Sequence, residues 1–483
     1  MDLYRLIEDF EDKGIKKEID ITSITEKLSE VTDGCMFFAV KGSKFDGNEH
    51  ICDAIIKGAR VIVTERTDIL VDGDCVVITV NNVRKALAYA SNEFYGRPAD
   101  KLCMIGITGT NGKTTTAHMV HHILTENGIE CGLIGTVGVM HGMNTESSSY
   151  TTPDAVTLFS TLSNMVKNGM THVVMEVSSQ ALDQERVCGI HFKIGAFTNL
   201  SVDHLDYHLD MNSYAKTKLK LFDMAEMCVV NIDSDFSEPF KEYKRDGCVV
   251  YTFSAHADAD FRAENVNLTA NGNRFDIVRM STFTVESVVQ KICGFFNVYN
   301  SLAAYTISSL LGLSDHDISH ALATFLPVKG RMEKVETDRG FTVIIDYAHT
   351  PDGLGNILSS IRMCCKGKIL TVFGCGGDRD RSKRPLMGKI AAALSDEVIV
   401  TSDNPRNEDP EEIIKDIWVG MKKCNSAVKI TDRKEAIIYA LSKAKENDIV
   451  LLAGKGHETY QIIKGKKCHF DEREVIDEYL NGR

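Results

Sequence analysis

The sequence predicts an α/β protein with three domains, the central one built on a mostly parallel sheet. Short apolar runs, typical of buried parallel strands, alternate with helical segments along the chain. A glycine-rich turn at Gly106–Thr116 joins one such run to a helix, as phosphate-binding loops do. Two segments, Tyr95–Pro98 and Phe325–Arg331, interrupt the alternation. We therefore expect domains at residues 1–99, 100–330 and 331–483.

Apolar runs bounded by polar or glycine residues mark the strands. In the first domain these are 36–40, 59–63 and 76–80, with helices at 51–57 and 82–94. In the central domain they are 102–107, 173–177 and 194–199, with a helix at 113–126. In the last domain they are 342–346, 368–373, 397–401 and 449–453, and a glycine-rich turn at 374–377 resembles a backbone approach to a ligand.

Composition limits the possible partners. A net charge of −13 and a pI near 5.6 argue against nucleic acid or an anionic membrane as the main partner. No run of about 18 apolar residues occurs, so no membrane span is expected. The first residues have no signal-peptide character. Fourteen cysteines without Cys-x-x-Cys spacing indicate reduced thiols. We expect a cytoplasmic monomer acting on small molecules.

The turn at Gly106–Thr116 predicts a nucleotide triphosphate site. Backbone N–H groups at a helix N-terminus favour an anion, Lys113 adds a positive charge for the terminal phosphates, and Thr114 offers a hydroxyl to Mg²⁺. The strict phosphate-loop pattern requires glycine at position 107, which is Ile107. The loop is therefore a variant, and an ordinary glycine-rich turn with a surface lysine is the alternative.

Two further strand ends should meet this loop. Glu176–Ser179 and Thr198–Leu200 follow buried strands, and ligands bind beyond the carboxyl ends of parallel strands. His204 lies in an acidic loop a few residues further on. Glu176 and His204 are candidate ligands of a divalent cation beside the phosphates. A solvated acidic loop is the alternative for His204.

The order of several motifs resembles the Mur ligase family, ATP-dependent enzymes that build the peptide stem of peptidoglycan. The resemblance covers roughly residues 100 to 470 and rests on Gly109–Thr115, Glu176, His204, Gly294–Asn300, Gly330–Glu333 and Asp346–Asp352. It implies a UDP-substrate-binding N-terminal domain, a central ATPase domain, and a Rossmann-like C-terminal domain that brings the amino acid. Contacts shared between two domains imply closure over ATP.

The resemblance also implies roles for individual residues. ATP would be bound by Gly109, Thr110, Asn111, Gly112, Lys113, Thr114, Thr115, Asn297, Asn300, Arg331 and Asp346, where the two asparagines contact adenine and the last two residues hold phosphate and ribose. Mg²⁺ would be bound by Thr114, Glu176, His204 and Lys218. The catalytic residues would be Lys113, Glu176, His204 and Lys218.

Lys218 matches the family's carbamylated lysine. Carbamylation turns the cation into an anion that can bind Mg²⁺ beside the γ-phosphate. The spacing from His208 favours Lys218 over Lys216. The alternative is an ordinary solvated helix face, since three lysines lie close together here.

The motif Asp403-Asn404-Pro405-Arg406 resembles the signature of family members that add meso-diaminopimelate instead of lysine. Diaminopimelate carries an extra carboxylate at its far end, which an arginine binds bidentately, whereas the ammonium of lysine would be repelled. Arg379 would be a further carboxylate partner, and Gly454 and Glu458 would supply polar contacts. A turn with a surface arginine is the alternative.

The muramoyl-peptide side matches the family at Thr151, Thr152, Ser178, Gln184 and Arg186. Two positions depart from it. An Asp-Ser-Arg triplet expected in the first domain is replaced by Lys27-Leu28-Ser29, and Tyr150 stands where asparagine is common. These departures favour a paralogue with a weakened or altered acceptor.

The resemblance implies an ATP-dependent amide ligase that joins diaminopimelate to the D-glutamyl carboxylate of UDP-N-acetylmuramoyl-L-alanyl-D-glutamate through an acyl phosphate. One alternative is a paralogous or folylpolyglutamate-synthetase-like ligase with another acceptor, which the altered triplet favours. Another is a non-catalytic nucleotide-binding protein, against which the intact Lys113, Glu176, His204 and Lys218 count.

Overall fold

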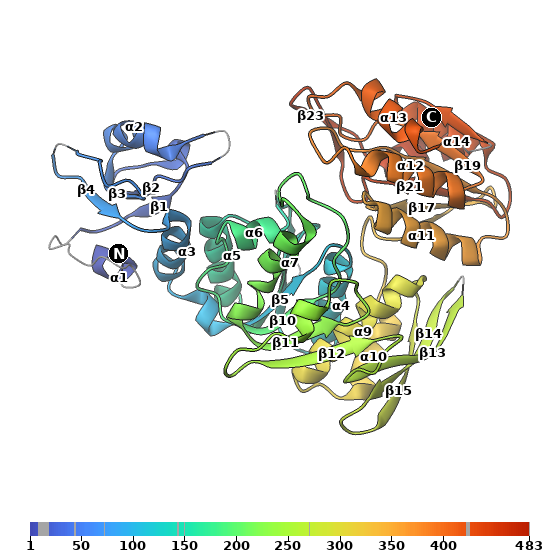
Figure 1. Cartoon of the computed structure of the whole chain (residues 1–483), viewed down its shortest axis with the longest axis horizontal. Helices are drawn as coiled ribbons and strands as arrows, with labels where there is room; N and C mark the ends of the chain where they lie inside the picture. The colour runs from blue at the N-terminus through green and yellow to red at the C-terminus, as the bar shows by residue number, and fades with distance from the viewer. Residues whose placement is uncertain are drawn as a thin grey trace.

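Three α/β parts follow one another along the chain, each around its own sheet (Figure 1). The structure is a computed structural model that describes residues 1–7, 19–42, 45–71, 73–142, 144–148, 150–269, 271–421 and 426–482. The N-terminal part lies at one end, the central part in the middle and the C-terminal part at the other end. The predicted α/β class is confirmed, while the boundaries at residues 99 and 330 stay predictions.

The N-terminal part has a four-stranded parallel sheet in the order β1-β2-β3-β4. Its elements are α1 (Leu3–Leu6), β1 (Ser23–Thr25), η1 (Leu28–Glu30), β2 (Cys35–Phe38), η2 (Gly47–His50), α2 (Ile51–Ile56), β3 (Ala59–Thr64), β4 (Val76–Thr79) and α3 (Val83–Phe94). The expected strands and helices are confirmed to within two residues. Helix α3 packs against α5 of the central part, so it joins the two.

The central part has an eleven-stranded sheet in the order β15-β14-β13-β12-β11-β10-β5-β9-β6-β7-β8. Its strands are β5 (Cys103–Thr108), β6 (Cys131–Gly135), β7 (Gly138–His141), β8 (Asn144–Glu146), β9 (His172–Glu176), β10 (Phe192–Phe197), β11 (Ala225–Asn231), β12 (Val249–Ser254), β13 (Phe261–Thr269), β14 (Gly272–Arg279) and β15 (Thr284–Gln290). Its helices are η3 (Pro98–Lys101), α4 (Lys113–Glu126), α5 (Ala155–Lys167), α6 (Ser179–Asp183), α7 (Met211–Leu219), η4 (Phe222–Met224), α8 (Glu238–Lys241), α9 (Phe295–Leu310) and α10 (Asp315–Thr324).

Helices cover both faces of the parallel strands in this sheet. Buried side chains of α4, α9 and α10 form one hydrophobic cluster, and those of α5 and α7 belong to another. The strands between them are buried apolar runs, as a two-sided sheet requires. This arrangement places the carboxyl ends of β5, β9 and β10 at one edge, where the predicted ligand site lies.

The two ends of the central sheet differ from the expected strand–helix alternation. Strands β13, β14 and β15 form an antiparallel ribbon, and β6, β7 and β8 also pair antiparallel. Four of the nine β13 residues are polar and exposed, so the ribbon lacks the continuous apolar runs by which the parallel strands were predicted. The sheet is parallel only from β6 to β13.

The C-terminal part has a six-stranded sheet in the order β16-β17-β21-β18-β19-β20, parallel except for the edge strand β16. Its strands are β16 (Glu333–Glu336), β17 (Thr342–Asp346), β18 (Ile369–Phe373), β19 (Glu397–Val400), β20 (Ala427–Lys429), β21 (Ile449–Ala453) and the hairpin β22 (Tyr460–Ile463) and β23 (Lys466–His469). Its helices are α11 (Pro351–Cys364), α12 (Lys383–Leu394), α13 (Pro410–Val419), α14 (Arg433–Lys443) and α15 (Glu472–Leu480).

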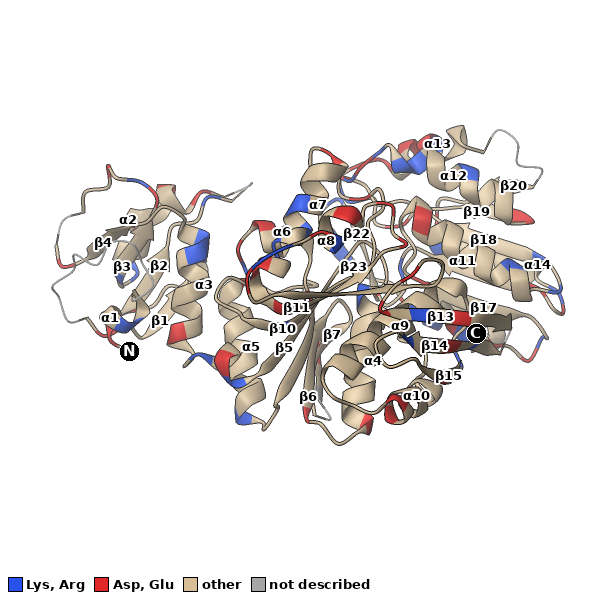
Figure 2. Ribbon diagram, turned by 60° about the horizontal axis from the view of Figure 1, so that its bottom comes forward, with Lys and Arg blue, Asp and Glu red and all other residues tan. Residues whose placement is uncertain are grey.

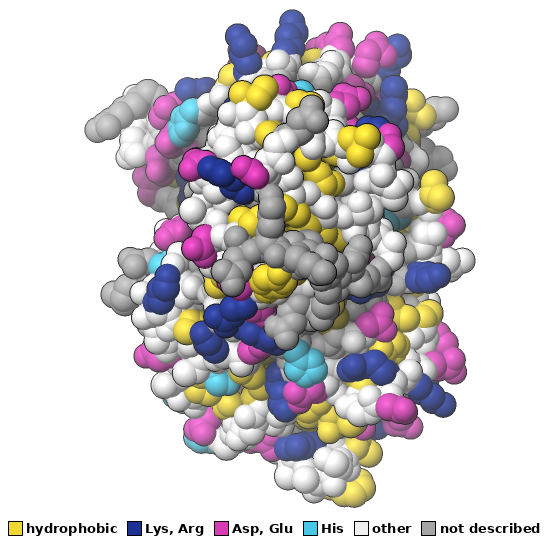
Figure 3. Space-filling view, turned by 90° about the vertical axis from the view of Figure 1, so that its left-hand side faces the viewer, with side chains coloured by type: hydrophobic (Ala, Val, Ile, Leu, Met, Phe, Trp, Pro, Cys, Tyr) yellow, Lys and Arg dark blue, Asp and Glu magenta, His cyan; other side chains and the backbone are white. Residues whose placement is uncertain are grey.

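Charged residues of both signs are spread over all three parts (Figure 2). On the face at the N-terminal end, hydrophobic side chains are scattered among charged ones (Figure 3). No helix in the described ranges has the length and apolarity that crossing a membrane would take.

Candidate active site

The loop between β5 and α4 is built for close contact with a ligand. Gly109 has a φ of 148°, and a Cβ there would overlap the Thr198 hydroxyl. Gly112 has a φ of 86°, and a Cβ there would overlap the Asn300 amide oxygen. No side chain caps the start of α4 at Gly112, so its first N–H groups remain open to an anion. The geometry therefore suits a phosphate group.

The two other predicted strand ends meet this loop. The Thr110 N–H donates to the Asn199 carbonyl at 2.8 Å, and the Val177 N–H donates to the Ile107 carbonyl at 2.8 Å. The Thr198 hydroxyl donates to the Asn111 carbonyl at 2.7 Å. The expected convergence of the three segments is confirmed.

Glu176 is the anionic centre of the site and is 1% exposed. Its Oε2 accepts hydrogen bonds from the hydroxyls of Thr114 at 2.9 Å and Thr136 at 3.1 Å, and its Oε1 accepts from the Thr136 N–H at 2.7 Å. Among the described residues, no three His, Cys, Asp or Glu side chains form a metal-binding group. A carboxylate beside a threonine hydroxyl nevertheless fits Mg²⁺, which takes few protein ligands and keeps waters or phosphate oxygens.

Two lysines approach the loop, Lys113 half-buried and Lys218 buried. The Lys113 Nζ donates to the carbonyls of Gly109 at 2.9 Å and Thr110 at 3.0 Å, and the Lys218 Nζ donates to the Gly109 carbonyl at 2.8 Å. Burial lowers the pKa of Lys113, and burial and the charge of Lys113 hold the pKa of Lys218 well below its ordinary value. Lys218 lies over the Tyr214 ring, with its Nζ 4.5 Å from the ring centroid. Two amine groups thus share one carbonyl beside the phosphate-binding loop, and their mutual repulsion favours the neutral form of Lys218.

His204 lies at the edge of this site, with a φ of 55°. Burial lowers its pKa to about 4, so the ring is neutral at pH 7 and able to bind a metal. Its Nε2 is 3.3 Å from Asp203 Oδ2. The other neighbours of Asp203 come from the C-terminal part, namely Lys383, with Nζ 3.5 Å from Oδ1, and His349, with Nε2 3.7 Å from Oδ2.

A cleft of about 990 Å³ lies between the central and C-terminal parts. The predicted site residues that line it are Thr110, Asn111, Gly112, Lys113, Thr114, Thr115, Thr151, Thr152, Glu176, Ser178, Gln184, Arg186, His204, Asn297, Asn300, Arg331, Asp346, Arg379, Arg406 and Glu458. The predicted residues that do not line it are Gly109, Lys218, Asp403, Asn404, Pro405 and Gly454.

Asn297 and Asn300 lie on α9 and are both buried. Asn297 Nδ2 donates to the Cys293 carbonyl at 2.7 Å, and Asn300 Nδ2 donates to Asn297 Oδ1 at 2.9 Å. These bonds fix both amides against the phosphate-binding loop, because Asn300 also accepts from the Thr116 hydroxyl at 3.4 Å.

Arg331 and Asp346 lie where the chain enters the C-terminal part. Arg331 donates to the Thr114 hydroxyl at 3.1 Å, and its Nε is buried without a hydrogen-bond partner among the described residues. A guanidinium with a free buried N–H group is suited to bind an anion. Asp346 accepts the N–H groups of Met332 at 2.8 Å and Ala348 at 2.7 Å, and burial raises its pKa. Asp346 therefore fixes this junction as well as facing the cleft.

The residues predicted for the muramoyl peptide form a connected network. The Thr152 hydroxyl donates to the Glu176 carbonyl at 2.8 Å and accepts from the Ser178 N–H at 3.0 Å. Arg186 donates to the Thr152 carbonyl at 2.9 Å and to Gln184 Oε1 at 2.7 Å. Arg186 thus lines the cleft with its guanidinium oriented by Thr152 and Gln184.

In the C-terminal part, Asp403 is buried with its Oδ2 lacking a hydrogen-bond partner among the described residues. Burial would raise the pKa of Asp403, but Lys455 and Arg433 outweigh that effect and lower it. Gly454 has a φ of 116°, and a Cβ there would lie 2.7 Å from Asp403 Oδ2. Because Gly454 has no side chain, the space beside the Asp403 carboxylate stays open.

The predicted arginines both line the cleft. Arg406 has a φ of 52°, donates from NH1 to the Gly377 carbonyl at 2.8 Å, and is tied to the β22 strand by its N–H. Arg379 is exposed and donates to the Asp378 carbonyl at 3.1 Å. Both guanidinium groups keep donors for an incoming carboxylate, since each forms few bonds of its own.

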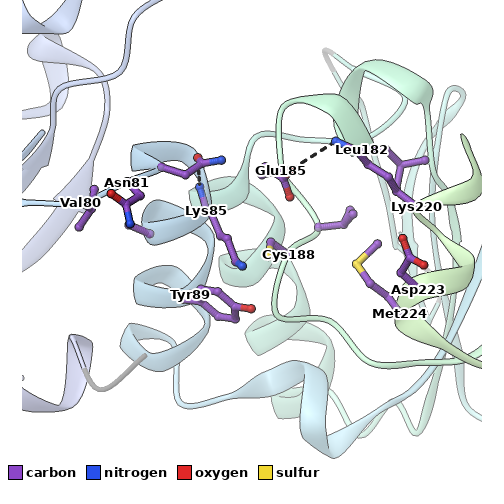
Figure 4. A pocket seen from close by; sticks show the side chains of 13 residues that line it. Val80, Asn81, Lys85, Tyr89, Leu182, Glu185, Cys188, Lys220, Asp223 and Met224 are labelled. Carbon is purple, nitrogen blue, oxygen red and sulfur yellow. Dashed lines mark hydrogen bonds and ion pairs between the residues drawn. The ribbon is translucent and has the colours of Figure 1, made fainter. Parts of the chain in front are cut away.

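A second cavity of about 640 Å³ lies between α3 and the α6–α7 region (Figure 4). No predicted site residue lines it. Lys220 and Glu185 pair across part of its wall, with Nζ 3.3 Å from Oε1.

Several residues of the site were not predicted. Thr136 directly follows β6, so the rule that ligands bind beyond parallel strand ends could have found it. Asp203, His349 and Lys383 form one of the contacts between the two parts, and no sequence spacing relates Asp203 to the other two because domain packing brings them together.

Family models account for most of the chain. The Mur ligase family, catalytic domain, matches residues 20–95, the Mur ligase middle domain matches residues 107–308, and the Mur ligase, glutamate ligase domain, matches residues 330–456.

Curated relatives match over nearly the full length. A UDP-N-acetylmuramoyl-L-alanyl-D-glutamate--2,6-diaminopimelate ligase of Caldanaerobacter subterraneus subsp. tengcongensis is 44% identical over 97% of this chain and 98% of its own. The protein of the same name from Clostridioides difficile is 42% identical over 100% of both chains. The chain belongs to the Mur ligase family.

Solved structures agree with this assignment. A structure of a UDP-N-acetylmuramoyl-L-alanyl-D-glutamate--2,6-diaminopimelate ligase has a TM-score of 0.70 at 28% identity, covering 100% of this chain and 99% of its own. A Mycobacterium tuberculosis folylpolyglutamate synthase has a TM-score of 0.62 at 17% identity, covering 77% and 92%, which shows a shared fold alone.

Proposed function

We propose that this chain is an ATP-dependent ligase of the cytoplasm that adds meso-2,6-diaminopimelate to UDP-N-acetylmuramoyl-L-alanyl-D-glutamate. The observation that carries the proposal is one cleft lined both by the phosphate-binding loop with Lys113 and Glu176 and by Arg406 and Glu458 of the C-terminal part. Full-length relatives at 42–44% identity that carry this name support it.

The reaction has two steps. The D-glutamyl γ-carboxylate attacks the γ-phosphorus of ATP, the bond to the β-phosphate oxygen breaks, and ADP leaves. The amine of diaminopimelate then attacks the acyl carbon, phosphate leaves, and the nitrogen loses a proton. Lys113, the open N–H groups of α4 and Arg331 stabilise the charge on the transferring phosphoryl group.

Thr114 and Glu176 would hold Mg²⁺, and His204 and a carbamylated Lys218 would serve a second ion. Mg²⁺ supplies neutralisation of phosphate charge. Glu176 stays oriented by Thr136. Lys218 is buried against the Gly109 carbonyl, where a solvated helix face would not place it, and this burial supports its selection over the exposed Lys216.

The three parts have separate tasks in this proposal. The central part, 100–330, binds ATP, with Asn297 and Asn300 on the base, while Asp346 of the C-terminal part holds the ribose. The N-terminal part, 1–99, binds the UDP moiety. The muramoyl peptide is bound by residues of the central part, namely Thr151, Thr152, Ser178, Gln184 and Arg186. The C-terminal part, 331–483, binds diaminopimelate through Arg379, the segment Asp403–Arg406, Gly454 and Glu458. The enzyme acts as a monomer.

The charge pattern of the C-terminal pocket favours diaminopimelate over lysine. Arg406 and Arg379 offer donors to the distal carboxylate, while Glu458, which lines the same cleft, offers a carboxylate acceptor to an ammonium. Lysine would satisfy the acceptor but leave the guanidinium groups without an anion.

The altered triplet Lys27–Ser29 bears on the acceptor. Lys27 Nζ lies 3.4 Å from Asp154 Oδ2 of the central part, so the segment still adjoins the central part next to Thr152. A ligase with another acceptor is the rival that this altered sequence favours.

A phosphate-release assay that crosses two acceptors with two amines tests the proposal. The acceptors are UDP-N-acetylmuramoyl-L-alanyl-D-glutamate and a folate, and the amines are diaminopimelate and lysine. We expect phosphate only with the muramoyl dipeptide and diaminopimelate together, and none from Lys113→Ala. Release with lysine but not diaminopimelate would refute the specificity, and release with the folate would favour the rival acceptor. Silence with every pair would favour a non-catalytic protein.

A further inference from the structure

Lys455 is a fully buried cation directly behind Glu458, which lines the cleft where diaminopimelate is proposed to bind. It lies in the loop after the interior strand β21 and is 0% exposed. Its Nζ is 2.9 Å from Glu458 Oε2 and donates to Asn404 Oδ1 at 3.3 Å. Asn404 Nδ2 donates to the same Glu458 oxygen at 2.8 Å. The three side chains therefore form a closed triangle.

In this triangle the buried ammonium of Lys455 holds the side chains of Asn404 and Glu458, both of which are predicted to contact the substrate. Asn404 Oδ1 also accepts the N–H of Ile462 at 3.0 Å, which orients the amide. A buried ammonium is stabilised only when it is paired and hydrogen-bonded, so Lys455 has a single geometry here. Glu458 lines the cleft, whereas Lys455 does not. Lys455 thus touches the pocket residues and not the substrate.

We propose that Lys455 is a positioning residue for amine recognition, which holds Glu458 and Asn404 in the arrangement that receives diaminopimelate. This role rests on the proposed function and adds to it the residue that fixes the positions of Glu458 and Asn404. Lys455 also pairs directly with the Glu458 carboxylate, and its positive charge helps to lower the pKa of the neighbouring buried Asp403.

If Lys455 only stabilised the fold, its loss would loosen the whole loop, including the side that contacts the entry to the C-terminal part. Gly456 packs against Gly330 at the entry to the C-terminal part, and Arg473 donates to the Gly456 carbonyl at 3.2 Å. Loosening this side would disturb Arg331 and hence ATP. The two roles therefore predict changes in the KM of different substrates.

The experiment compares steady-state kinetics of the full chain with Lys455→Met, Glu458→Gln and the double variant. We expect Lys455→Met to raise the KM for diaminopimelate at least about tenfold, since hydrogen bonds to charged groups are worth that much. The KM for ATP and for the muramoyl dipeptide should stay within about twofold of the wild type. Lys434→Met, which removes a lysine paired with Glu478 on the surface of the same part, should leave every constant unchanged.

The double variant separates positioning from bulk stability. If Lys455 acts through Glu458, the double variant has the KM of Glu458→Gln within about twofold, because the two changes remove one interaction. An unchanged KM for diaminopimelate in Lys455→Met, or multiplying effects in the double variant, would overturn the inference. If Lys455→Met does not fold by circular dichroism, Lys455→Gln undergoes the same comparison with the same criteria.

The failure of the proposed function is distinguishable from the failure of this inference. If the wild type itself releases no phosphate with diaminopimelate, the proposed function fails. If the wild type is active and Lys455→Met keeps the wild-type KM, only the role of Lys455 fails.

Discussion

Lys113 and Lys218 approach the same backbone carbonyl from different helices. Both Nζ atoms lie within 2.9 Å of the Gly109 oxygen, so the two charges repel and one of them is favoured as a neutral amine. A neutral lysine amine can add carbon dioxide, which would replace the repulsion by attraction. The geometry gives a physical reason for modification at Lys218 that sequence spacing alone does not supply.

Replacement of Lys218 should therefore abolish turnover where replacement of its neighbour does not. We expect Lys218→Met to lower kcat at least about 100-fold, since it removes a group that would serve the transferring phosphate. Lys216→Met, on the exposed face of the same helix, is the matched control and should retain full activity. Activity of the wild type should also fall when dissolved carbon dioxide is removed and return with bicarbonate. Equal losses in the two variants would contradict the choice of Lys218.

Single residues of the site were predicted to different degrees. Lys113 and Thr114 follow from a local pattern, because a strand, a turn and a helix place them whatever the rest of the chain does. Arg406 required the family resemblance. No sequence pattern predicted the contact between Asp203 and Lys383, since the two residues are distant in the chain and meet only when two parts pack together.

Among the elements, the turn at Gly330 links the central part to the C-terminal sheet. Gly330 has a φ of 70°, and a Cβ there would overlap the backbone of Gly456 and His457. The Tyr347 N–H donates to the Gly330 carbonyl at 2.9 Å. The turn is thus held against two loops that face the cleft, and Arg331 follows it directly.

Gly330→Ala should destabilise the protein more than the same change at a matched glycine. Gly465, in the turn of the β22–β23 hairpin, has a φ of 74° and open space around it. Both substitutions carry a backbone cost of about 1 kcal/mol. Only Gly330→Ala adds a backbone clash, so we expect a total of about 3 kcal/mol there. Thermal unfolding should show the lower Tm for Gly330→Ala, and equal Tm values would contradict the packing of this turn.

Several strands with continuous apolar sequences were predicted, whereas the buried strand β6 and the strands with alternating sequences were not. The buried strands β5, β9 and β21 and helix α4 follow from hydrophobic pattern and turn chemistry. The antiparallel ribbon of β13 to β15 carries exposed polar side chains on its strands, which weakens the same signal. Its pairing depends on contacts between segments, not on any one segment.

In the whole molecule, one cleft is lined by the phosphate-binding loop of the central part and by the predicted amino-acid-binding residues of the C-terminal part. Polar contacts connect the central and C-terminal parts near the phosphate-binding loop. They join Asn111 Nδ2 to Asp352 at 2.8 Å, Arg331 to Thr114 at 3.1 Å, Lys383 to Asp203 at 3.5 Å and His349 to Asp203 at 3.7 Å. All are polar and lie beside the loop, so the parts can separate and close again as substrates enter and leave.

In the proposed reaction, ATP activates a carboxylate on the acceptor before the amine attacks. The most direct measurement labels both oxygens of the D-glutamyl γ-carboxylate with oxygen-18 and follows them through one turnover with ATP and diaminopimelate. We predict that one labelled oxygen appears in the released phosphate and the other stays in the new amide, because the acyl phosphate forms through that carboxylate oxygen. Unlabelled phosphate released with an equal yield of the amide would contradict this account.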